Sequence, residues 1–286
     1  MTKIRLHSDL HLEAFRGQLP DVLATKFIPP AESDQESILV LAGDITGNIP
    51  QLVSFIQILE NRFKKVIFVC GNHCYYRQHY ETWNAEAKSQ FKSSLFNTEA
   101  SFGDVCCEEI DGVRFVFGTL WGDGGLTLQD QGTVGYFLND FRIIQIGEDW
   151  HRFTVQDMIK IHKEQKAKID AFLKQPTTCT KTVVVTHHMP TRRVVDKRFL
   201  ETDGSDGANG GFVGNCESIL AYDHAPDYWM FGHTHSAKDE FQWKTKCLCN
   251  PTGYRGEWGD GFTGGSIVIL DTETGVVSKT GFPGHL

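Results

Sequence analysis

The sequence predicts a mixed α/β fold that contains two β-sheets. Short apolar runs alternate with longer segments of helical spacing, and the pattern changes to strands and turns after Phe241. Continuous apolar strands that alternate with helices are typical of a parallel sheet covered on both faces. The strand-rich end adds a second sheet, so the pattern does not fit a plain doubly wound sheet.

The first elements form a strand–helix–strand unit. Strands are predicted at Ile4 to Ser8, Ser37 to Ala42 and Lys65 to Cys70. Between the last two, Gln51 to Phe63 carries apolar residues at helical spacing, and Pro50 suits the start of a helix. These strands therefore predict the parallel part of a sheet.

The rest of the chain repeats this alternation before strands take over. The predicted elements are helices at Arg77 to Phe91 and Thr154 to Leu173, and strands at Val113 to Gly118, Thr182 to Thr186, Tyr228 to Phe231, Phe241 to Cys249, Ser266 to Leu270 and Val276 to Lys279. Two long segments, residues 121–150 and 189–215, lack regular patterning and are predicted as loops. Both follow strands, so both can line a site at the strand ends.

The bulk composition fits one globular domain over residues 1–286. Hydrophobic residues make up 40% and charged residues 22% of the chain, and no repeat or long linker divides it. No apolar run approaches the ~18 residues that a membrane span needs. Residues 1–9 look like a first strand without the features of a signal peptide, so we expect a cytoplasmic protein.

Cysteine usage and net charge narrow the class of protein. The eight cysteines include no Cys-x-x-Cys pair, which disfavours a structural zinc site. Their even number permits disulfides, but several lie in apolar strand patterns, and we expect reduced, mostly buried thiols. The formal net charge of −8 argues against a dedicated nucleic-acid binder, although it does not exclude an enzyme with a local basic patch.

Polar motifs follow the predicted strands. They are Asp9-Leu-His11, Gly43-Asp44, Gly71-Asn72-His73, His187-His188 and Gly232-His233-Thr234-His235. In open α/β sheets, ligands bind beyond the carboxyl ends of the strands. The five motifs are therefore expected to converge on one pocket.

The residue types in these motifs indicate what the pocket holds. Asp, His and Asn without Cys suit divalent ions such as Mn, Fe, Zn, Co or Ni. Each Asp-x-His or His-x-His pair would put two ligands on one face of an extended chain. The candidate ligands are too many for one tetrahedral zinc and fit two metals that share a carboxylate: Asp9, His11, Asp44, Asn72, His187, His233 and His235.

Such a pair of metals suits the hydrolysis of phosphate esters. Two metals roughly 3.5–4 Å apart can hold the attacking and leaving oxygens of an in-line phosphoryl displacement. They can also lower the pKa of a bridging water enough to yield hydroxide near neutral pH. His73, beside the candidate ligands, can face the leaving group as a general acid or stabilise its charge.

In their order along the chain, the motifs resemble those of the calcineurin-like metallophosphoesterase superfamily. The resemblance spans Asp9 to His235 and implies a four-layer fold, with two central mixed β-sheets flanked by helices. It implies two divalent metal ions, with Mn expected first and Fe, Zn, Ni or Co as alternatives, and it makes His73 the catalytic histidine. By the same resemblance, Asp44 bridges the metals, one of which is bound by Asp9, His11 and His235 and the other by Asn72, His187 and His233.

The chain departs from the family pattern beside two of the motifs. Cys74 follows Gly-Asn-His where the family usually has Asp or Glu, and Cys70 precedes it where the protein-phosphatase branch has Arg. Gly47 stands where that branch has an Asp that orients the catalytic histidine. These departures favour the bacterial-type phosphodiesterase or phosphohydrolase branch, and they leave open which group orients His73.

Other polar residues are expected to have ordinary structural roles. Surface or hydrogen-bonded positions are predicted for His7, His79, His151, His162, His224 and His285. A solvated position is favoured over a phosphate-binding role for the basic residues Arg142, Arg192, Arg193, Lys197 and Arg198. The sequence does not decide whether His188 has a role near the substrate or simply packs in the structure.

The sequence thus predicts an enzyme that acts on a small-molecule phosphate ester, with nucleotide-like phosphodiesters as the leading substrate class. The acidic balance disfavours nucleic acid as a partner, and no membrane partner is expected. Two alternatives stay open: a nuclease, and a metal-binding scaffold with little catalytic activity. Cys74 and Gly47 keep the scaffold alternative open, because they depart from the family pattern. The sequence does not indicate an oligomeric state.

Overall fold

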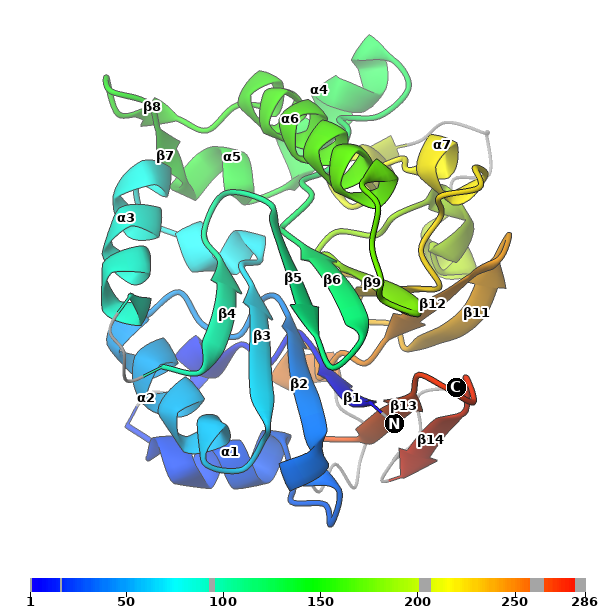
Figure 1. Ribbon diagram of the computed structural model, residues 1–286. Coiled ribbons are helices and arrows are strands. Elements are labelled where there is room, and N and C mark those ends of the chain that lie inside the picture. The colour runs from blue at the N-terminus through cyan, green and yellow to red at the C-terminus, as the bar shows by residue number, and fades with distance from the viewer. Residues whose placement is uncertain (1, 16, 93–95, 201–206, 258–264, 281–286) are drawn as a thin grey trace.

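Two mixed β-sheets of six strands each form the centre of the structure, a computed structural model that describes residues 2–15, 17–92, 96–200, 207–257 and 265–280. Helices cover the outer faces of both sheets (Figure 1). The two-sheet, four-layer arrangement expected from the sequence is confirmed.

The first sheet has the strand order β14-β13-β1-β2-β3-β4. Its four parallel strands are β1 (Lys3–His7), β2 (Ser37–Ala42), β3 (Lys65–Val69) and β4 (Thr98–Ser101). The antiparallel strands β13 (Ile267–Asp271) and β14 (Val277–Thr280) extend it beyond β1.

The second sheet has the order β11-β12-β10-β9-β6-β5. Its parallel centre comprises β6 (Val113–Phe117), β9 (Lys181–Val185), β10 (Tyr228–Phe231) and β12 (Thr245–Cys249). The edge strands β5 (Cys106–Ile110) and β11 (Lys238–Gln242) are antiparallel to their neighbours.

The alternation of side chains along the strands builds three apolar layers. In β2, Ile38 and Val40 join the core between the two sheets, whereas Leu39 and Leu41 join the core beneath the helices. In β9, Val184 faces outward into a third core. Because both faces of these strands are buried, their sequences are continuously apolar.

Each outer core is closed by helices whose apolar residues face the sheet (Figure 1). The first sheet is covered by α1 (Pro20–Phe27), α2 (Ile49–Glu60) and α3 (Tyr80–Phe91), and the second by α6 (Val155–Lys174) and the short α7 (Glu217–Leu220). The sequence sets where α2 and α6 begin. The side chain of Asn48 caps α2, and Thr154 forms a capping box with Asp157 at α6.

Several predicted boundaries differ from those observed. The helix predicted from Arg77 begins only at Tyr80, because His79 caps it. The single strand predicted over Phe241 to Cys249 is a hairpin of β11 and β12 that turns at Trp243, whose φ is 53°. The sequence analysis did not identify α1, β4 or β5.

The prediction that residues 121–150 form only a loop is wrong. They contain α4 (Leu128–Phe137), α5 (Asp140–Ile143) and β7 (Gln145–Ile146), which pairs with β8 (His151–Arg152). Val134 is the one buried apolar residue of α4, whereas Leu128, Tyr136 and Phe137 are largely exposed. Without an apolar stripe, the helix leaves no periodic signal in the sequence. Residues 189–215 contain only short 3₁₀ turns where they are described.

The eight cysteines are all free thiols, as expected, and five of them are buried. None of the helices formed by the described residues is both long and apolar enough to span a membrane.

A buried ion pair anchors β1 to the segment before β2. The Arg5 side chain is fully buried, and its Nη1 lies 2.5 Å from Oδ1 of Asp34, whose Oδ2 also accepts from Arg62 at 2.8 Å. Asp34→Ala is expected to lower the free energy of unfolding by about 3–5 kcal/mol, because Arg5 would keep a buried charge without a partner. Urea denaturation measures this change.

The matched control for this ion pair is Glu36→Ala. It removes the partner of Lys3 in an exposed pair and is expected to cost about 0–1 kcal/mol. Equal losses in the two variants would contradict a special role for the buried pair.

Candidate metal centre

The predicted motifs lie at the carboxyl ends of strands from both sheets. Asp9 and His11 follow β1, Asp44 follows β2, and Asn72 lies in the 3₁₀ turn Asn72–Tyr75 after β3. His187 follows β9 in the second sheet. With His233 and His235, which follow β10, these side chains meet at the carboxyl ends of strands from the two stacked sheets.

The backbone of these motifs is not extended, contrary to the expectation from the sequence. Left-handed φ angles occur at Asp9 (55°), His11 (47°), Asp44 (52°), His233 (66°) and His235 (49°). Such angles are uncommon for residues other than glycine and concentrate at functional sites. The strand-period argument is therefore wrong, most clearly for His233 and His235, which join different clusters.

One cluster consists of Asp9, His11 and His235. Nε2 of His235 lies 3.1 Å from Nε2 of His11 and 3.5 Å from Oδ1 of Asp9. Two imidazole nitrogens at this distance can share at most one proton. A cation bound between the two rings would accept the lone pairs of both nitrogens.

A second cluster consists of Asp44, His187 and His233. Nε2 of His187 lies 3.3 Å from Oδ2 of Asp44 and 3.1 Å from Oδ1 of Asn72. His233 Nε2 is buried and has no hydrogen-bond partner. Oδ2 of Asp44 also lies 4.0 Å from Nε2 of His11, which places this carboxylate between the two clusters.

The surroundings keep Asp9, Asp44 and His233 in the protonation states that bind cations. Burial alone would raise the pKa of Asp44, but the nearby His187 and His73 lower it well below its usual range. Burial likewise opposes ionisation of Asp9, and its hydrogen bond with His235 lowers its pKa below the ordinary value. Burial lowers the pKa of His233 well below its usual value, so its ring is neutral. Charged carboxylates and a neutral imidazole fit divalent metal ions.

Comparison with known proteins places this arrangement in a family. A family model described as calcineurin-like phosphoesterase matches residues 2–237. The chain belongs to this family. It is therefore a phosphoester hydrolase of a metal-dependent kind, as the ordered motifs predicted.

Solved structures align with this chain at low sequence identity, and the first of the two below shares its fold. Phosphopantetheinyl hydrolase (PptH) from Mycobacterium tuberculosis aligns with a TM-score of 0.60 and 16% identity over 92% of this chain and 95% of its own. An archaeal phosphodiesterase aligns with a TM-score of 0.41 and 14% identity over 97% and 98% of the two chains. No curated protein matches the chain.

The phosphoesterase supports His73 with a carboxylate that the sequence analysis missed. Nδ1 of His73 lies 3.2 Å from Oε1 of Glu13, and its ring stacks on Tyr76 with 4.0 Å between centroids. Glu13 lies in the 3₁₀ turn Leu12–Ala14 that follows His11. The acidic residue two positions after Asp-x-His was the available signal, although nothing in the sequence linked it to His73.

Gly47 cannot carry the acidic side chain found in the protein-phosphatase branch. A Cβ at this position would lie 2.7 Å from the carbonyl oxygen of His73. Glu13 therefore occupies the role of orienting His73 from another segment. Cys74, the other departure, is buried in the apolar core, and its thiol lies 3.7 Å from the carbonyl oxygen of Thr46.

Asp140 is a second buried carboxylate that the sequence analysis missed. Its Oδ1 accepts from Nδ2 of Asn72 at 2.8 Å, and the hydroxyl of Tyr76 lies 3.2 Å from the same nitrogen. The amide is thereby oriented with its oxygen towards His187. Asp140 belongs to the segment predicted as a loop, and no sequence pattern connected it to Asn72.

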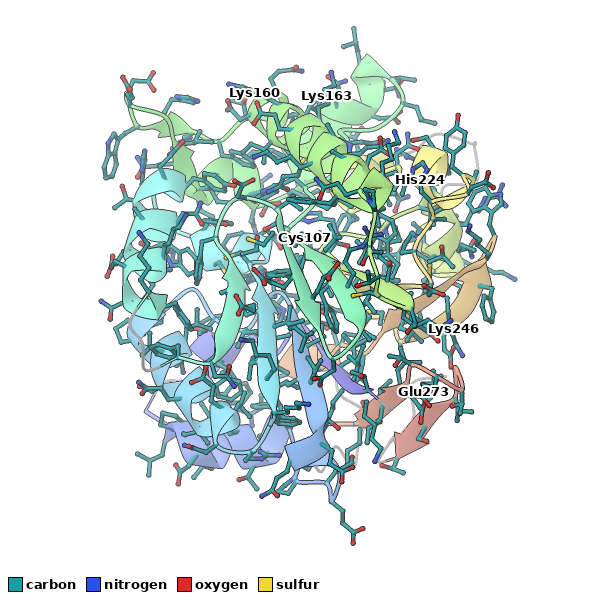
Figure 2. The ribbon with its side chains drawn as sticks, viewed as in Figure 1. Cys107, Lys160, Lys163, His224, Lys246 and Glu273 are labelled. Carbon is teal, nitrogen blue, oxygen red and sulfur yellow. The ribbon has the colours of Figure 1, made fainter. Side chains whose placement is uncertain are left out.

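Most of the remaining polar candidates bond to residues outside the clusters. His7, His79, His151, His162 and His224 bond outside the clusters, and His285 lies outside the described residues. Arg192 pairs with Asp123, Arg193 lies over the Trp243 ring, and Arg142 bonds to the Tyr136 carbonyl. His188 packs between Trp121 and His233. Exposed residues such as Lys160 and Lys163 lie on the outer helix α6 (Figure 2).

Glu13→Gln tests the support of His73. Loss of the carboxylate removes the anion that holds the imidazole, so kcat is expected to fall about 10–100-fold. Because Oε1 of Glu13 also lies 3.3 Å from Nδ1 of His11, kcat is compared at saturating Mn²⁺, with the metal content measured by mass spectrometry. The control Glu32→Gln changes an exposed carboxylate and should leave kcat unchanged, and unchanged turnover in Glu13→Gln would rule out the orienting role.

Asp140 is tested by two substitutions that separate geometry from charge. Asp140→Ala removes the acceptor that orients Asn72, and the affinity for added Mn²⁺ is expected to fall about 10–100-fold in calorimetric titrations. Asp140→Asn keeps an acceptor oxygen and should retain most of the affinity. Equal loss in both variants would show that charge, not orientation, is what Asp140 supplies.

Proposed function

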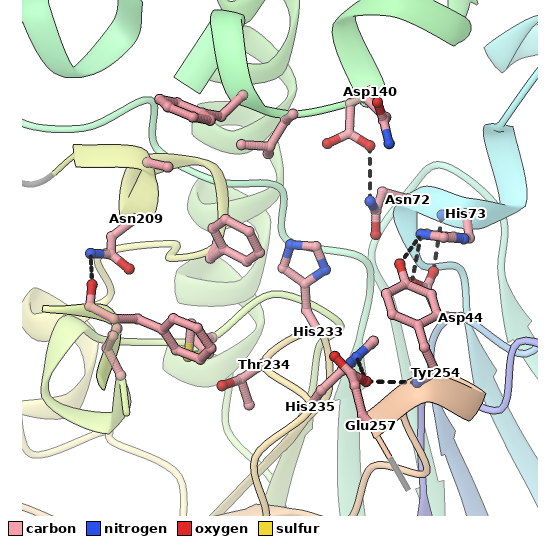
Figure 3. A pocket seen from close by; sticks show the side chains of 18 of the residues that line it. Asp44, Asn72, His73, Asp140, Asn209, His233, Thr234, His235, Tyr254 and Glu257 are labelled. Atoms are coloured by element: carbon pink, nitrogen blue, oxygen red, sulfur yellow. Dashed lines mark hydrogen bonds and ion pairs between the residues drawn. The ribbon is translucent and has the colours of Figure 1, made fainter. Parts of the chain in front are cut away.

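We propose that the chain is a phosphodiesterase, or a small-molecule phosphoesterase, that works with two divalent cations in a single domain over residues 1–286. The observation that carries this proposal is the position of Asp44. It belongs to one cluster of ligand-type side chains, with His187, and its Oδ2 also lies 4.0 Å from Nε2 of His11 in the other. A single cation would leave one of the clusters unused. The clusters also line a cavity into which His73 faces (Figure 3).

The residues present fit two cations, and the fit supports an assignment. Asp9, His11 and His235 would hold one, and Asn72, His187 and His233 the other, with Asp44 shared between them. The unpartnered, buried Nε2 of His233 supports this reading, because a ligand is the partner that it lacks. Nitrogen and oxygen donors are compatible with Mn, which the family resemblance puts first, and with Fe, Zn, Ni or Co. When bound, the cations would activate water and stabilise charge on the phosphoryl oxygens.

His73 is suited to move a proton at the leaving group. With Nδ1 directed at Glu13, Nε2 is the ring atom on the cavity side, where it lies 2.8 Å from the hydroxyl of Tyr254. Donation of a proton from Nε2 to the leaving oxygen would neutralise the charge that develops there. Tyr76, stacked on the ring, restricts its rotation.

The alternatives from the sequence are less well supported. A nuclease would need cations along the phosphate backbone, but the described residues that line the cavity include no Lys or Arg. A scaffold has no use for an oriented His73, whereas Glu13 supplies that orientation. The cytoplasmic location and the nucleotide-like substrate class stay predictions.

The first test combines metal analysis with hydrolysis of bis(p-nitrophenyl) phosphate and p-nitrophenyl phosphate, each with Mn²⁺ and with chelator. About two metals per chain and chelator-sensitive cleavage, faster on the diester, are expected. Faster cleavage of the monoester would favour a phosphomonoesterase. Failure to bind metal after reconstitution would overturn the proposal.

Two variants separate metal binding from proton transfer. Asp44→Asn removes the shared charge and is expected to lose both metal and activity, whereas His73→Ala should keep its metal while kcat falls about 10²–10⁴-fold. His224→Ala is the control, because His224 pairs with Asp170 away from the clusters. Normal activity in Asp44→Asn would disprove the shared-ligand assignment.

A further inference from the structure

The cavity beside the clusters has two chemically different ends. Its volume is about 550 Å³, within the range of sites that enclose small organic molecules and larger than one phosphate group needs. Asp44, His73 and Tyr254 lie together at one end, and Asn209 lies across the cavity from them (Figure 3). Much of the remaining wall is apolar.

We call this wall the apolar arm and define it by the residues Phe137, Leu138, Met189, Phe199, Leu200 and Phe212. Three segments contribute to it: the end of α4, the residues after β9, and the 3₁₀ turn before Phe212. The arm begins at the clusters themselves, since the rings of Phe212 and His233 lie 4.6 Å apart. A substrate bound at the clusters would therefore extend directly onto it.

The arm is built by packing between these segments. A Cβ at Gly211 would lie 2.4 Å from Cδ2 of Leu138, so the lack of a side chain at Gly211 allows the turn to approach α4 closely. Nδ2 of Asn209 donates to the carbonyl oxygen of Phe199 at 3.0 Å and holds that segment against the cavity. These contacts fix the shape of the wall, and a preformed shape is what an organic ligand group needs.

Large apolar side chains of the arm are nevertheless open to solvent. Phe137 is 63% exposed, and Phe199 and Leu200 are each 50% exposed. Apolar surface that gathers at a cavity beside polar groups is typical of a binding site. The occupant would cover these side chains and gain the free energy of removing them from water.

The charges around the cavity restrict what that occupant carries. Asp140 and Glu257 add carboxylates to its lining, and among the described lining residues there is neither Lys nor Arg. Arg192 and Arg193 lie nearby in the chain but interact with Asp123 and Trp243. A second anionic group on the substrate would therefore lie against apolar or acidic surface and lose its hydration without compensation.

We propose that the apolar arm binds the uncharged organic group of the substrate, so that the enzyme prefers phosphate esters with one phosphate and a bulky apolar or aromatic substituent. This inference rests on the proposed function and narrows its substrate class. Substrates that carry a second phosphate or a carboxylate on this substituent are expected to bind more weakly at the same wall.

A series of diesters with one common leaving group tests the preference. The substrates are p-nitrophenyl esters of methyl, phenyl and 3-carboxyphenyl phosphate, assayed with the Mn²⁺-loaded protein. The phenyl diester is expected to exceed the methyl diester about tenfold in kcat/KM, mainly through a lower KM. The 3-carboxyphenyl diester should be no better than the methyl diester.

Variants of the arm locate the effect. Phe199→Ala and Leu200→Ala alter half-exposed side chains and are expected to reduce the phenyl advantage to about threefold or less, with the methyl diester affected less than twofold. Phe241→Ala is the matched control, because Phe241 is 64% exposed on β11 and lies outside the cavity lining. An unchanged phenyl preference in both arm variants would overturn the inference.

Binding of phosphonates, which are not hydrolysed, separates this inference from the proposed function. Benzylphosphonate is expected to bind the Mn²⁺-loaded protein about tenfold more tightly than methylphosphonate in calorimetry, and Phe199→Ala should remove the difference. If no ester is cleaved but this difference appears, the arm is supported and the hydrolase proposal fails. If esters are cleaved without a phenyl preference and the two phosphonates bind equally, the hydrolase proposal stands and the arm is overturned.

Discussion

The buried carboxylate of Asp44 is the constraint on which the rest of the site depends. Its Oδ1 accepts the backbone N–H of His73 at 3.0 Å, and its Oδ2 lies 3.3 Å from Nε2 of His187. A Cβ at Gly71 would lie 2.0 Å from Oδ1, and one at Gly43 would lie 2.2 Å from Nδ1 of His187. The glycines of these motifs are therefore required by the packing around one charge, because a buried carboxylate must be surrounded by groups that compensate it.

Asp9 fixes the second sheet to the first in the same way. Its carboxylate accepts the backbone N–H of His233 at 2.9 Å, which links the loop after β10 to the loop after β1. A Cβ at Gly232 would lie 2.6 Å from the carbonyl oxygen of Ala42. The carboxyl ends of the two sheets are thus joined through hydrogen bonds between backbone groups and carboxylates. Asp9 and His233 have left-handed φ angles at this junction, and the surrounding contacts stabilise that strained backbone.

Sequence analysis predicted the sheets and the motif residues because both leave local signals. Buried strands are continuously apolar, and the polar motifs follow them directly. It could not predict Glu13 or Asp140 as partners of His73 and Asn72, because these contacts join residues 60 and 68 positions apart. It also missed α4, whose exposed apolar residues have no periodic pattern. The structure explains why the apolar residues of α4 lack periodicity, since Phe137 at the end of the helix lines the cavity instead of packing in the core.

Catalysis and specificity are assigned to different parts of the chain. The ligand-type residues follow strands of two rigid sheets, whose core side chains are buried on both faces. The apolar arm comes from the segments between the strands, residues 121–150 and 189–215, which were expected from the sequence to line a site. Connecting segments tolerate change better than the elements that they join. Under the proposed assignment, substitutions at Phe199 or Leu200 would therefore alter substrate preference while Asp44 and its neighbours keep their geometry.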